Sequence, residues 1–281
     1  MPQGRRAIAM APWPRASLCA MYGGARLARA LVAHMVAGAL VLLLAQCPAA
    51  ADAHPCRSVL HQRSSYTVCE IDLRRHTVRL YWKGADDRPY AYLSALPRTL
   101  AAQPGRLEFA TNAGMFDAEL RPVGLYIEQG RELVRANTMP GHGNFHMKPN
   151  GVFFVSGDSA GVLETSAYLR QRPHVDLATQ SGPMLVINRR LHPRFDANSA
   201  SLKVRSGVGV RDLHTVLFAI SEAEVSFAQF AHLFRDALQC PNALFLDGGS
   251  APSLYIPARG RGGNFLPLGP MLGVFDRAAA P

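Results

Sequence analysis

Short segments in which apolar and polar residues alternate recur along the chain and limit what it can fold into. Pairs of such segments flank short turn sequences at residues 74–76, 129–130, 188–190 and 211–214. Alternation with a period of two places every second side chain on one face of a strand, and a tight turn joins antiparallel neighbours. We therefore expect β-hairpins at these four places and a further strand at residues 151–156.

One segment instead has the periodicity of a helix. Ser226 and Gln229 form the pattern of an N-terminal capping box, and the helix should end near Gln239, before Pro241. The expected core face of this helix comprises Phe227, Phe230, Ala231, Phe234 and Leu238. With many strands and few helices, the sequence predicts an α+β fold: a single domain of mixed, mainly antiparallel sheets over residues 54–281.

The N-terminal part has the order of features that marks a secretory signal peptide. Residues 31–47 are mostly apolar, basic side chains at Arg26 and Arg29 precede them, and Ala51-Asp52-Ala53 follows. We expect residues 1–53 to be this signal, cleaved after Ala53, with Met21 as the more ordinary start. The protein would then be exported, to the periplasm or beyond. An uncleaved membrane anchor is the alternative, and it would be the only contact with a membrane.

Charge and cysteine usage narrow the classes of partner. The formal net charge is +10, but the basic residues are scattered without a run, which argues against nucleic-acid binding and mildly favours anionic ligands. Cys56 and Cys69 are close enough in sequence to close a short loop in an oxidising compartment, and their pairing stays open. Cys240 is expected to be a small core residue. No pair of cysteines has the spacing of a zinc site.

Four segments place glycine and small polar residues where a predicted strand stops. They are residues 111–116 (TNAGMF), 179–185 (TQSGPML), 205–209 (RSGVG) and 246–250 (LDGGS). Glycine lets the main chain approach a ligand closely, and side chains at strand ends point out of the sheet, where binding sites collect. Four such segments in one domain favour a site for a polar ligand.

These segments resemble those of the phosphodiester glycosidase family. The family's Asn-Gly-Gly-Phe-Phe, Gln-Ser-Gly-Pro, Arg-Ser-x-x-Gly and Leu-Asp-Gly-Gly-Gly-Ser patterns correspond to residues 112–116, 180–183, 205–209 and 246–250, with Ala113 in place of one glycine and one glycine fewer before Ser250. Residues 143–153 match a further stretch of its bacterial branch. The resemblance implies an exported hydrolase that cleaves the glycosyl bond of a sugar-1-phosphodiester, in envelope or exopolysaccharide metabolism.

The resemblance also implies roles for particular residues. Asp247 would stabilise the positive charge that develops on the anomeric carbon, as nucleophile or as base for water. Arg205 would grip the phosphate with its guanidinium, and Asn112 would hydrogen-bond sugar hydroxyls or Asp247. The expected substrate-binding residues are Gly114, Gln180, Ser181, Gly182, Ser206, Gly248, Gly249 and Ser250. The simpler interpretations are a turn residue for Asp247, a surface ion pair for Arg205 and a loop brace for Asn112.

A second carboxylate and a metal are weaker predictions. Glycosidases commonly use two carboxylates, and Asp117 and Glu128 are the candidates for the second. His142, His146 and Lys148 share a loop, although isolated loop histidines are seldom metal ligands. No cofactor is implied. A structural divalent cation held by oxygen ligands stays open, because such a site leaves little trace in a sequence.

Two other functions compete with a hydrolase of sugar phosphates or polysaccharides. One is a non-catalytic protein that binds carbohydrate or phosphate during exopolysaccharide assembly. It would not need both Asp247 and Arg205. The other is a phosphodiesterase that cuts the P–O bond. That chemistry commonly uses two metal ions, and the sequence has no dense cluster of His and Asp to hold them.

Overall fold

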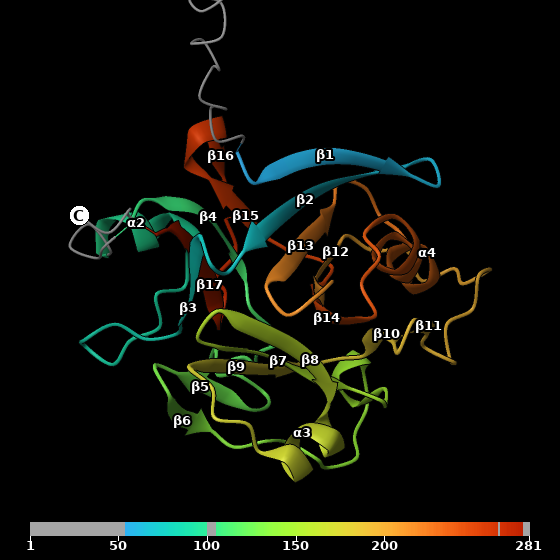
Figure 1. Ribbon diagram of the computed structural model, residues 1–281, viewed down its shortest axis with the longest axis horizontal. Coiled ribbons are helices and arrows are strands. Elements are labelled where there is room, and N and C mark those ends of the chain that lie inside the picture. The colour runs from blue at the N-terminus through green and yellow to red at the C-terminus, as the bar shows by residue number, and fades with distance from the viewer. Residues whose placement is uncertain (1–53, 100–104, 264, 278–281) are drawn as a thin grey trace, which may run out of the picture. The chain divides into compact units, whose positions relative to one another are not determined.

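Three antiparallel sheets are formed by the residues that the computed structural model describes, 54–99, 105–263 and 265–277 (Figure 1). Every strand pair within these ranges is antiparallel, which confirms the predicted α+β class with mainly antiparallel sheets and few helices. The predicted signal peptide at 1–53 lies outside the described residues. Within the described part of the chain, no helix is both long and apolar enough to cross a membrane.

The largest sheet has seven strands in the order β1-β2-β13-β12-β14-β10-β11 among the described residues. Its centre combines segments that are far apart in sequence, because β12 pairs with both β13 and β14. The strands are β1 (Cys56–His61), β2 (Ser64–Asp72), β13 (Thr215–Ser221), β12 (Arg205–Val210), β14 (Asn242–Gly248), β10 (Met184–Ile187) and β11 (Arg190–Leu191).

Two five-stranded sheets complete the described part of the fold, in the orders β16-β15-β4-β17-β3 and β6-β5-β9-β7-β8. The first contains β16 (Arg261–Gly262), β15 (Leu254–Ile256), β4 (Leu107–Asn112), β17 (Met271–Asp276) and β3 (His76–Tyr81). The second contains β6 (Arg131–Val134), β5 (Tyr126–Glu128), β9 (Leu177–Ser181), β7 (Gly151–Ser156) and β8 (Ser159–Glu164).

The helices are short, and the predicted one is the best capped. α4 (Phe227–His232) begins with both hydrogen bonds of the Ser226–Gln229 capping box, as predicted, and continues into a single π-helical turn, η3 (Leu233–Ala237). The predicted helix therefore forms, but its last turn is wider than an α-helix. The other short helices are η1 (Leu93–Ala95), α2 (Leu96–Thr99), η2 (Asn144–His146), α3 (Thr165–Gln171) and η4 (Pro257–Arg259).

Three of the four predicted hairpins are confirmed, and the first is wrong. β5 pairs with β6, β10 with β11, and β12 with β13 across the predicted turns. The turn at residues 74–76 does not join paired strands. β2 pairs with β1 and β13, so both of its edges are occupied, and β3 pairs with β17 in a different sheet.

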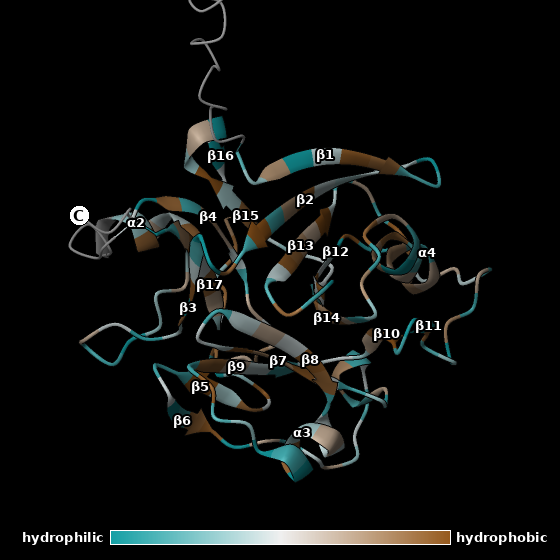
Figure 2. Ribbon diagram, viewed as in Figure 1, coloured by the Kyte–Doolittle hydropathy of each residue, from teal (hydrophilic) through white to brown (hydrophobic). Residues whose placement is uncertain are grey.

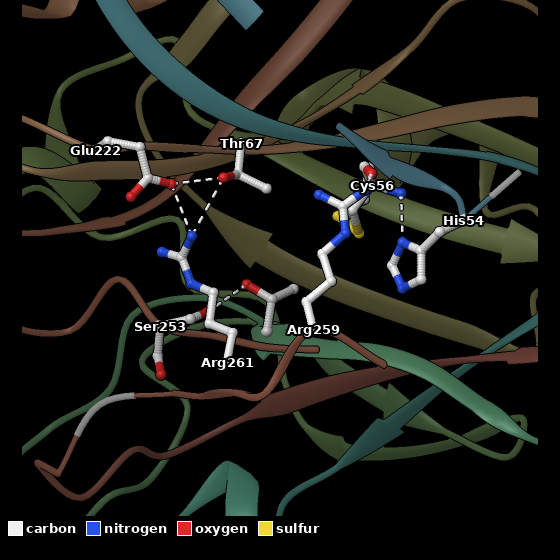
Figure 3. The surroundings of a disulfide bond; sticks show 9 residues. His54, Cys56, Thr67, Glu222, Ser253, Arg259 and Arg261 are labelled. Atoms are coloured by element: carbon white, nitrogen blue, oxygen red, sulfur yellow. Dashed lines mark hydrogen bonds and ion pairs between the residues drawn. A yellow bond between two sulfur atoms is a disulfide. The ribbon is translucent and has the colours of Figure 1, made fainter. Parts of the chain in front are cut away.

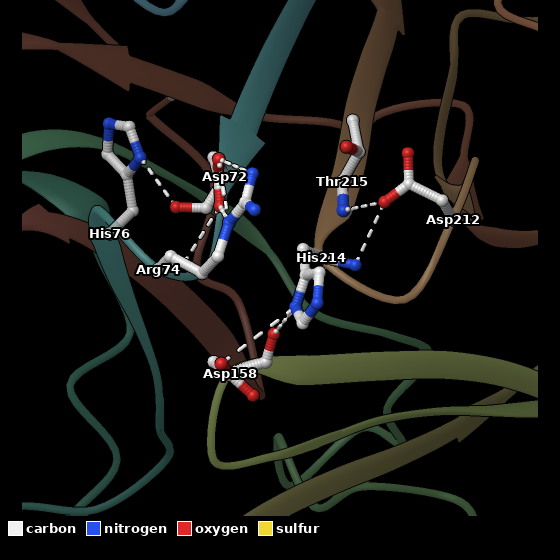
Figure 4. A network of polar contacts seen from close by, with 7 residues as sticks. All are labelled: Asp72, Arg74, His76, Asp158, Asp212, His214 and Thr215. Carbon is white, nitrogen blue, oxygen red and sulfur yellow. Dashed lines mark hydrogen bonds and ion pairs between the residues drawn. The ribbon is translucent and has the colours of Figure 1, made fainter.

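Polar contacts surround the turn that connects β2 in the largest sheet to β3 in another sheet (Figure 4). The Arg74 guanidinium pairs with Asp72 at 2.6 Å, and this pairing lowers the pKa of the Asp72 carboxyl. On the facing turns, His214 Nδ1 lies 2.7 Å from the main-chain oxygen of Asp158. The main-chain N–H of Leu73 donates to the main-chain oxygen of His214 at 2.9 Å, so the turn between β2 and β3 is held in place without a hairpin ladder.

All three sheets contribute to one hydrophobic core. The ring of Phe218 on β13 meets the rings of Phe109 on β4 and Phe153 on β7, with centroids 5.7 Å and 5.9 Å apart. Figure 2 shows the apolar residues mainly on the strands and the hydrophilic residues mainly in the connecting loops. A second cluster of buried residues, including Phe230 and Phe234, packs α4 and η3 against the largest sheet.

A disulfide bond closes the β1–β2 hairpin (Figure 3). Cys56 and Cys69 face each other across the two strands and are bonded, which resolves the pairing that the sequence left open. Close by, Arg261 pairs with Glu222 at 2.7 Å, and Thr67 donates a hydrogen bond to the same carboxylate. Cys240 is buried and unpaired with another cysteine, as predicted for a core residue.

Candidate functional site

The ends of four strands from three sheets meet in one hydrogen-bonded cluster. Asn112 at the end of β4 donates its amide to Ser206 Oγ on β12 at 2.9 Å. Ser206 in turn donates to the main-chain oxygen of Asp247 on β14 at 3.2 Å. Ser181 at the end of β9 donates to the main-chain oxygen of Leu246 at 2.9 Å. We call Asn112, Ser181, Ser206 and Asp247 the strand-end cluster.

Asp247 is the carboxylate of this cluster. It lies opposite Ser206 at a β-bulge, where β14 has one residue more than β12. Such bulges re-aim side chains and are frequent beside active sites. Its Oδ1 accepts a hydrogen bond from the main-chain N–H of Gly248 at 2.7 Å, but burial disfavours the charge and raises the pKa of Asp247 from 3.8 to about 7. A carboxyl group that ionises near neutral pH suits acid–base or nucleophilic work.

Asn112 is completely buried, and its amide is bonded within the protein. The side-chain oxygen accepts from the main-chain N–H of Ser253 at 3.2 Å while Nδ2 donates to Ser206. Thr111, its neighbour, donates to the main-chain oxygen of Ser253 at 2.8 Å. Asn112 therefore joins β4 to β12 and reaches Asp247 only through Ser206, which makes it an orienting group and not the predicted direct partner of the Asp247 carboxylate.

The Arg205 guanidinium lies on the helix-facing side of the largest sheet. It stacks on Phe227 of α4 at 3.6 Å from the ring centroid, and the side chain is 1% exposed. Nε and one terminal nitrogen donate to the main-chain oxygens of Val225 and Ser201 at 2.8 Å and 2.9 Å. A phosphate could be gripped only by the remaining end of the guanidinium.

Burial lowers the pKa of Arg205 to about 10, and no carboxylate of the described residues pairs with it. An internal cation without a counter-ion produces a positive field in its surroundings. On the adjacent strand, Arg205 faces Gly248, the residue that follows Asp247. The main chain of Arg205 thus lies beside the strand that carries Asp247, whereas its guanidinium lies on the other face of the sheet.

The predicted glycines fall into two groups. A side chain on Gly114 would approach Thr179 Oγ1 to 3.0 Å, and one on Gly182 would approach Asn150 Cβ to 2.6 Å, so these two allow strand ends to pack closely. A side chain on Gly248 would approach the Phe245 ring to 3.0 Å. Gly249 differs from these three glycines, because a side chain there would meet no atom within 4 Å. Its φ of +75° nevertheless favours glycine. The loop from Gly249 to the exposed Ser250 is therefore the accessible side of the cluster.

Gln180 serves as a brace and does not project from the cluster. Its side-chain oxygen accepts from the main-chain N–H groups of Leu125 and Asn137 at 2.9 Å and 2.8 Å. Its nitrogen donates to the main-chain oxygen of Asn137 at 2.8 Å and to Thr165 Oγ1 at 3.3 Å. All its polar atoms are thus bonded to the protein, which leaves Gln180 to hold the loop at residues 135–138.

Neither candidate for a second carboxylate joins the strand-end cluster. Asp117 accepts from two main-chain N–H groups of its own turn and pairs with Arg121 at 2.8 Å. Glu128 lies with Leu177 around a separate cavity, whereas the cluster begins at Ser181 at the other end of β9. Four residues of a strand span roughly 13 Å.

The loop with His142, His146 and Lys148 carries no metal-binding arrangement in the described structure. His146 lies against Gly141, with Nδ1 3.1 Å from the main-chain oxygen of Met139, and Lys148 donates to Thr138 at 2.7 Å. Among the described residues no three His, Cys, Asp or Glu side chains gather as metal ligands.

Sequence reasoning missed several residues that complete the cluster. Thr179 donates to the main-chain oxygen of Ala113 at 2.8 Å, and Asn150 bonds Phe145 and Thr165 next to Gly182. Ser253 supplies the N–H that fixes Asn112. Thr179 and Asn150 stand inside the segments singled out from the sequence, so the alternation along β9 could have identified Thr179 as a partner on the same face as Ser181.

Comparison with known proteins identifies a family and a relative that the chain resembles. The sequence profile of the family described as phosphodiester glycosidase matches residues 105–275. The uncharacterized protein YigE of Escherichia coli K12 is 37% identical over 184 residues, which are 66% of this chain and 70% of that protein.

Two solved structures share the fold. The catalytic domain of zebrafish N-acetylglucosamine-1-phosphodiester alpha-N-acetylglucosaminidase, auto-inhibited by its pro-peptide, has a TM-score of 0.55 at 15% identity, covering 79% of this chain and 82% of that one. A hypothetical protein from Synechocystis has a TM-score of 0.52 at 16% identity, covering 79% of this chain and 61% of that one.

Proposed function

Because the chain belongs to the phosphodiester glycosidase family, we propose that it is a hydrolase that cleaves the bond between the anomeric carbon of a sugar and a phosphodiester oxygen. Water supplies the hydroxyl that ends on the anomeric carbon and the proton that ends in solution, and the phosphate leaves as a monoester. The observation that carries this proposal is Asp247, a partly buried carboxyl at a strand end with a pKa of about 7.

Asp247 acts in its ionised form, as nucleophile or as base for the attacking water. In either role its negative charge stabilises the positive charge that develops on the anomeric carbon. A phosphate is a good leaving group and needs little protonation, so a second carboxylate in the cluster is not required. Ser206 and Asn112 fix the main chain on which Asp247 stands, which keeps the carboxyl oriented.

Arg205 contributes positive charge to the leaving-group side. Its guanidinium has no carboxylate partner among the described residues, and its main chain faces Gly248 beside the open Gly249 loop. The field of this cation favours an anionic phosphate over a neutral leaving group. We assign the phosphate to the Gly249 side of the cluster and the sugar to the Asp247 side.

The zebrafish protein whose fold this chain shares is named for its action on N-acetylglucosamine-1-phosphodiester, which makes that compound the first substrate to test. We further propose that the chain acts after export, in the cell envelope, since residues 31–47 have the character of a signal peptide. Its natural substrate would then be a phosphodiester-linked sugar of the envelope or of an exopolysaccharide.

The test is release of N-acetylglucosamine from a synthetic α-linked phosphodiester by the purified protein. Asp247→Asn should lower kcat by a hundredfold or more, about 3 kcal/mol of barrier. Asp158→Asn, which removes an exposed carboxylate on the β7–β8 turn, should turn over at the wild-type rate.

If the wild type is inert on a panel of sugar phosphodiesters but binds them, the protein is a carbohydrate- or phosphate-binding protein and the hydrolase proposal is wrong. If Asp247→Asn retains full activity, another group performs the chemistry assigned to Asp247.

A further inference from the structure

The connection between β16 and β17 carries the most exposed large apolar side chain of the described residues. Phe265 is 95% exposed, and Leu266 beside it is 51% exposed. Single apolar residues are common on protein surfaces, but two adjacent ones that extend into solvent gain little from packing within the chain. This pair is therefore a candidate for a contact with something outside the chain.

The exposed pair stands between two anchored ends. Leu268 is buried, and its main-chain N–H donates to the main-chain oxygen of Ala91 at 2.7 Å. Gly263 packs near Leu93, which a side chain on Gly263 would approach to 3.5 Å. Between these two contacts, Tyr92 is 42% exposed. Its ring combines an apolar body with a polar hydroxyl, and such rings are enriched at the interface between membrane and water.

No acidic residue occurs in the two stretches that form this surface, residues 88–107 and 248–275. All the charged side chains in these stretches are arginines: Arg88, Arg98, Arg106, Arg259 and Arg261. Arginine keeps its positive charge at every physiological pH and matches the geometry of phosphate groups. The sequence around the exposed pair is therefore suited to an anionic partner.

Only part of this positive charge is offset within the protein. Arg106 and Arg261 pair with carboxylates from outside the two stretches, at 2.6 Å and 2.7 Å. Just before the first stretch, Asp87 pairs with Lys83 at 2.9 Å. Arg259 is exposed, its guanidinium donates to a main-chain oxygen, and no carboxylate in the described ranges pairs with it. A net positive potential next to the apolar pair attracts an anionic surface.

We propose that this surface docks on an anionic lipid membrane, with Phe265 and Leu266 inserted among the headgroups and the surrounding arginines facing lipid phosphates. Apolar side chains flanked by basic ones are the pattern of proteins that lie on a membrane. Three exposed apolar side chains fall short of the roughly 800 Å² that each partner contributes to a stable protein interface. A bilayer needs no complementary shape, so a small apolar projection is sufficient.

Docking through this surface brings the strand-end cluster close to the lipid. A side chain on Gly263 would approach Ser253 Oγ to 3.2 Å, and the main chain of Ser253 holds the Asn112 amide. Met271, where β17 begins, faces Asn112 across the sheet. Both ends of the connection thus adjoin the end of β4 that carries Asn112. The proposal concerns where the protein binds and does not depend on the hydrolase function.

Sedimentation with lipid vesicles tests this proposal. Residues 54–281 are used, because they form a compact unit with their own hydrophobic cores and because the apolar stretch at 31–47 would bind lipid by itself. Vesicles of phosphatidylglycerol and phosphatidylethanolamine should bind the protein at least about fivefold more tightly than phosphatidylcholine vesicles, the effect of one arginine near an anionic surface. Raising the salt concentration should weaken this binding.

A matched pair of variants locates the contact. Phe265→Ser should weaken binding to the anionic vesicles by about tenfold or more, because the largest inserted side chain is lost. Leu213→Ser, which removes a side chain that is 66% exposed in the β12–β13 turn, should bind as the wild type does. Both variants should keep the wild-type melting temperature, since neither side chain is buried.

Several results would overturn the proposal. They are absence of binding to the anionic vesicles, equal binding to both kinds of vesicle, and equal losses in Phe265→Ser and Leu213→Ser. If light scattering shows a dimer that Phe265→Ser converts to a monomer, the surface is an interface between two copies of the chain and the membrane assignment is wrong.

Discussion

Burial disfavours the ionised form of Asp247, and this should make the stability of the protein depend on pH. Its pKa is about 7 in the folded chain against 3.8 for an exposed carboxyl, so the folded state holds the proton more tightly. The contribution of Asp247 to the free energy of unfolding should therefore be largest below about pH 4 and be lost as the pH rises through 7. Asp247→Asn should remove this decline and be more stable than the wild type at pH 8, by at most about 4 kcal/mol.

Urea unfolding at pH 4, 6 and 8 measures this effect, and Asp212 provides a control of the opposite sign. Burial acts to raise the pKa of Asp212, but the main-chain N–H groups of His214 and Thr215 donate to its carboxylate and lower it. Asp212→Asn should lose stability at pH 8 and approach the wild type below pH 4. Equal pH dependence in wild type and Asp247→Asn would contradict the desolvated state assigned to Asp247.

Arg205 should act through its charge and its packing together. Arg205→Lys keeps a cation but loses the paired bonds to Val225 and Ser201, whereas Arg205→Met keeps the bulk on Phe227 and loses the charge. We expect Arg205→Met to raise the KM for a sugar phosphodiester about tenfold or more relative to Arg205→Lys, because the anionic substrate loses its attraction. Circular dichroism and melting temperatures check that both variants fold. An equal KM would show that the charge is not felt by the substrate.

A predicted site residue belongs to the cluster only if its side chain lies on the side of the strand that faces the cluster. Asn112, Ser181, Ser206 and Asp247 were recognisable because polar residues at strand ends collect at one place. Gln180 stands between two residues that face the cluster, so alternation turns its side chain to the opposite face. The bulge beside Asp247 and the direction of the Arg205 side chain depend on partners distant in sequence, which no local pattern specifies.

The N-terminus of α4 is an element that was predictable in detail because its signal is local. Ser226 Oγ accepts from the main-chain N–H of Gln229 at 3.1 Å, and Gln229 Oε1 accepts from the main-chain N–H of Ser226 at 2.9 Å. Ser226→Ala should destabilise the protein by about 1 kcal/mol. Urea denaturation beside Ser58→Ala, an exposed serine on β1, measures the difference. If Ser226→Ala lowers the free energy of unfolding no more than Ser58→Ala does, the hydrogen bonds of the cap do not contribute to stability.

The β1–β2 hairpin is an element whose stability should depend on redox conditions. Cys56 and Cys69 are 13 residues apart. A cross-link that closes a loop of this length lowers the conformational entropy of the unfolded chain, which stabilises the folded state by about 3 kcal/mol. Reductant should therefore lower the melting temperature of the wild type. It should leave the double variant Cys56→Ser, Cys69→Ser unchanged. Identical shifts in both proteins would place the redox effect elsewhere.

The first hairpin shows why pairing is harder to predict than strands. The segments at β2 and β3 have the right alternation, and both form strands. Their partners are set by long-range competition, since β13 takes the open edge of β2 and β17 takes β3. At the scale of the whole molecule the sequence therefore indicates the class, many strands and few helices, while the order of strands in each sheet follows from contacts between distant segments.

The pH dependence of turnover combines all three scales, because the carboxyl, the strand ends that hold it and the core that dehydrates it must all be intact. If Asp247 acts ionised, kcat/KM should rise about tenfold per pH unit well below pH 7 and level off above its pKa of about 7. An ordinary exposed carboxylate would give the same rise near pH 4. Rates on an alkyl sugar phosphodiester, whose single phosphate proton does not titrate between pH 5 and 9, measure the profile. A fall in activity above pH 7 would show that the protonated form of Asp247 is the active one, and it would then serve as the acid for the departing phosphate.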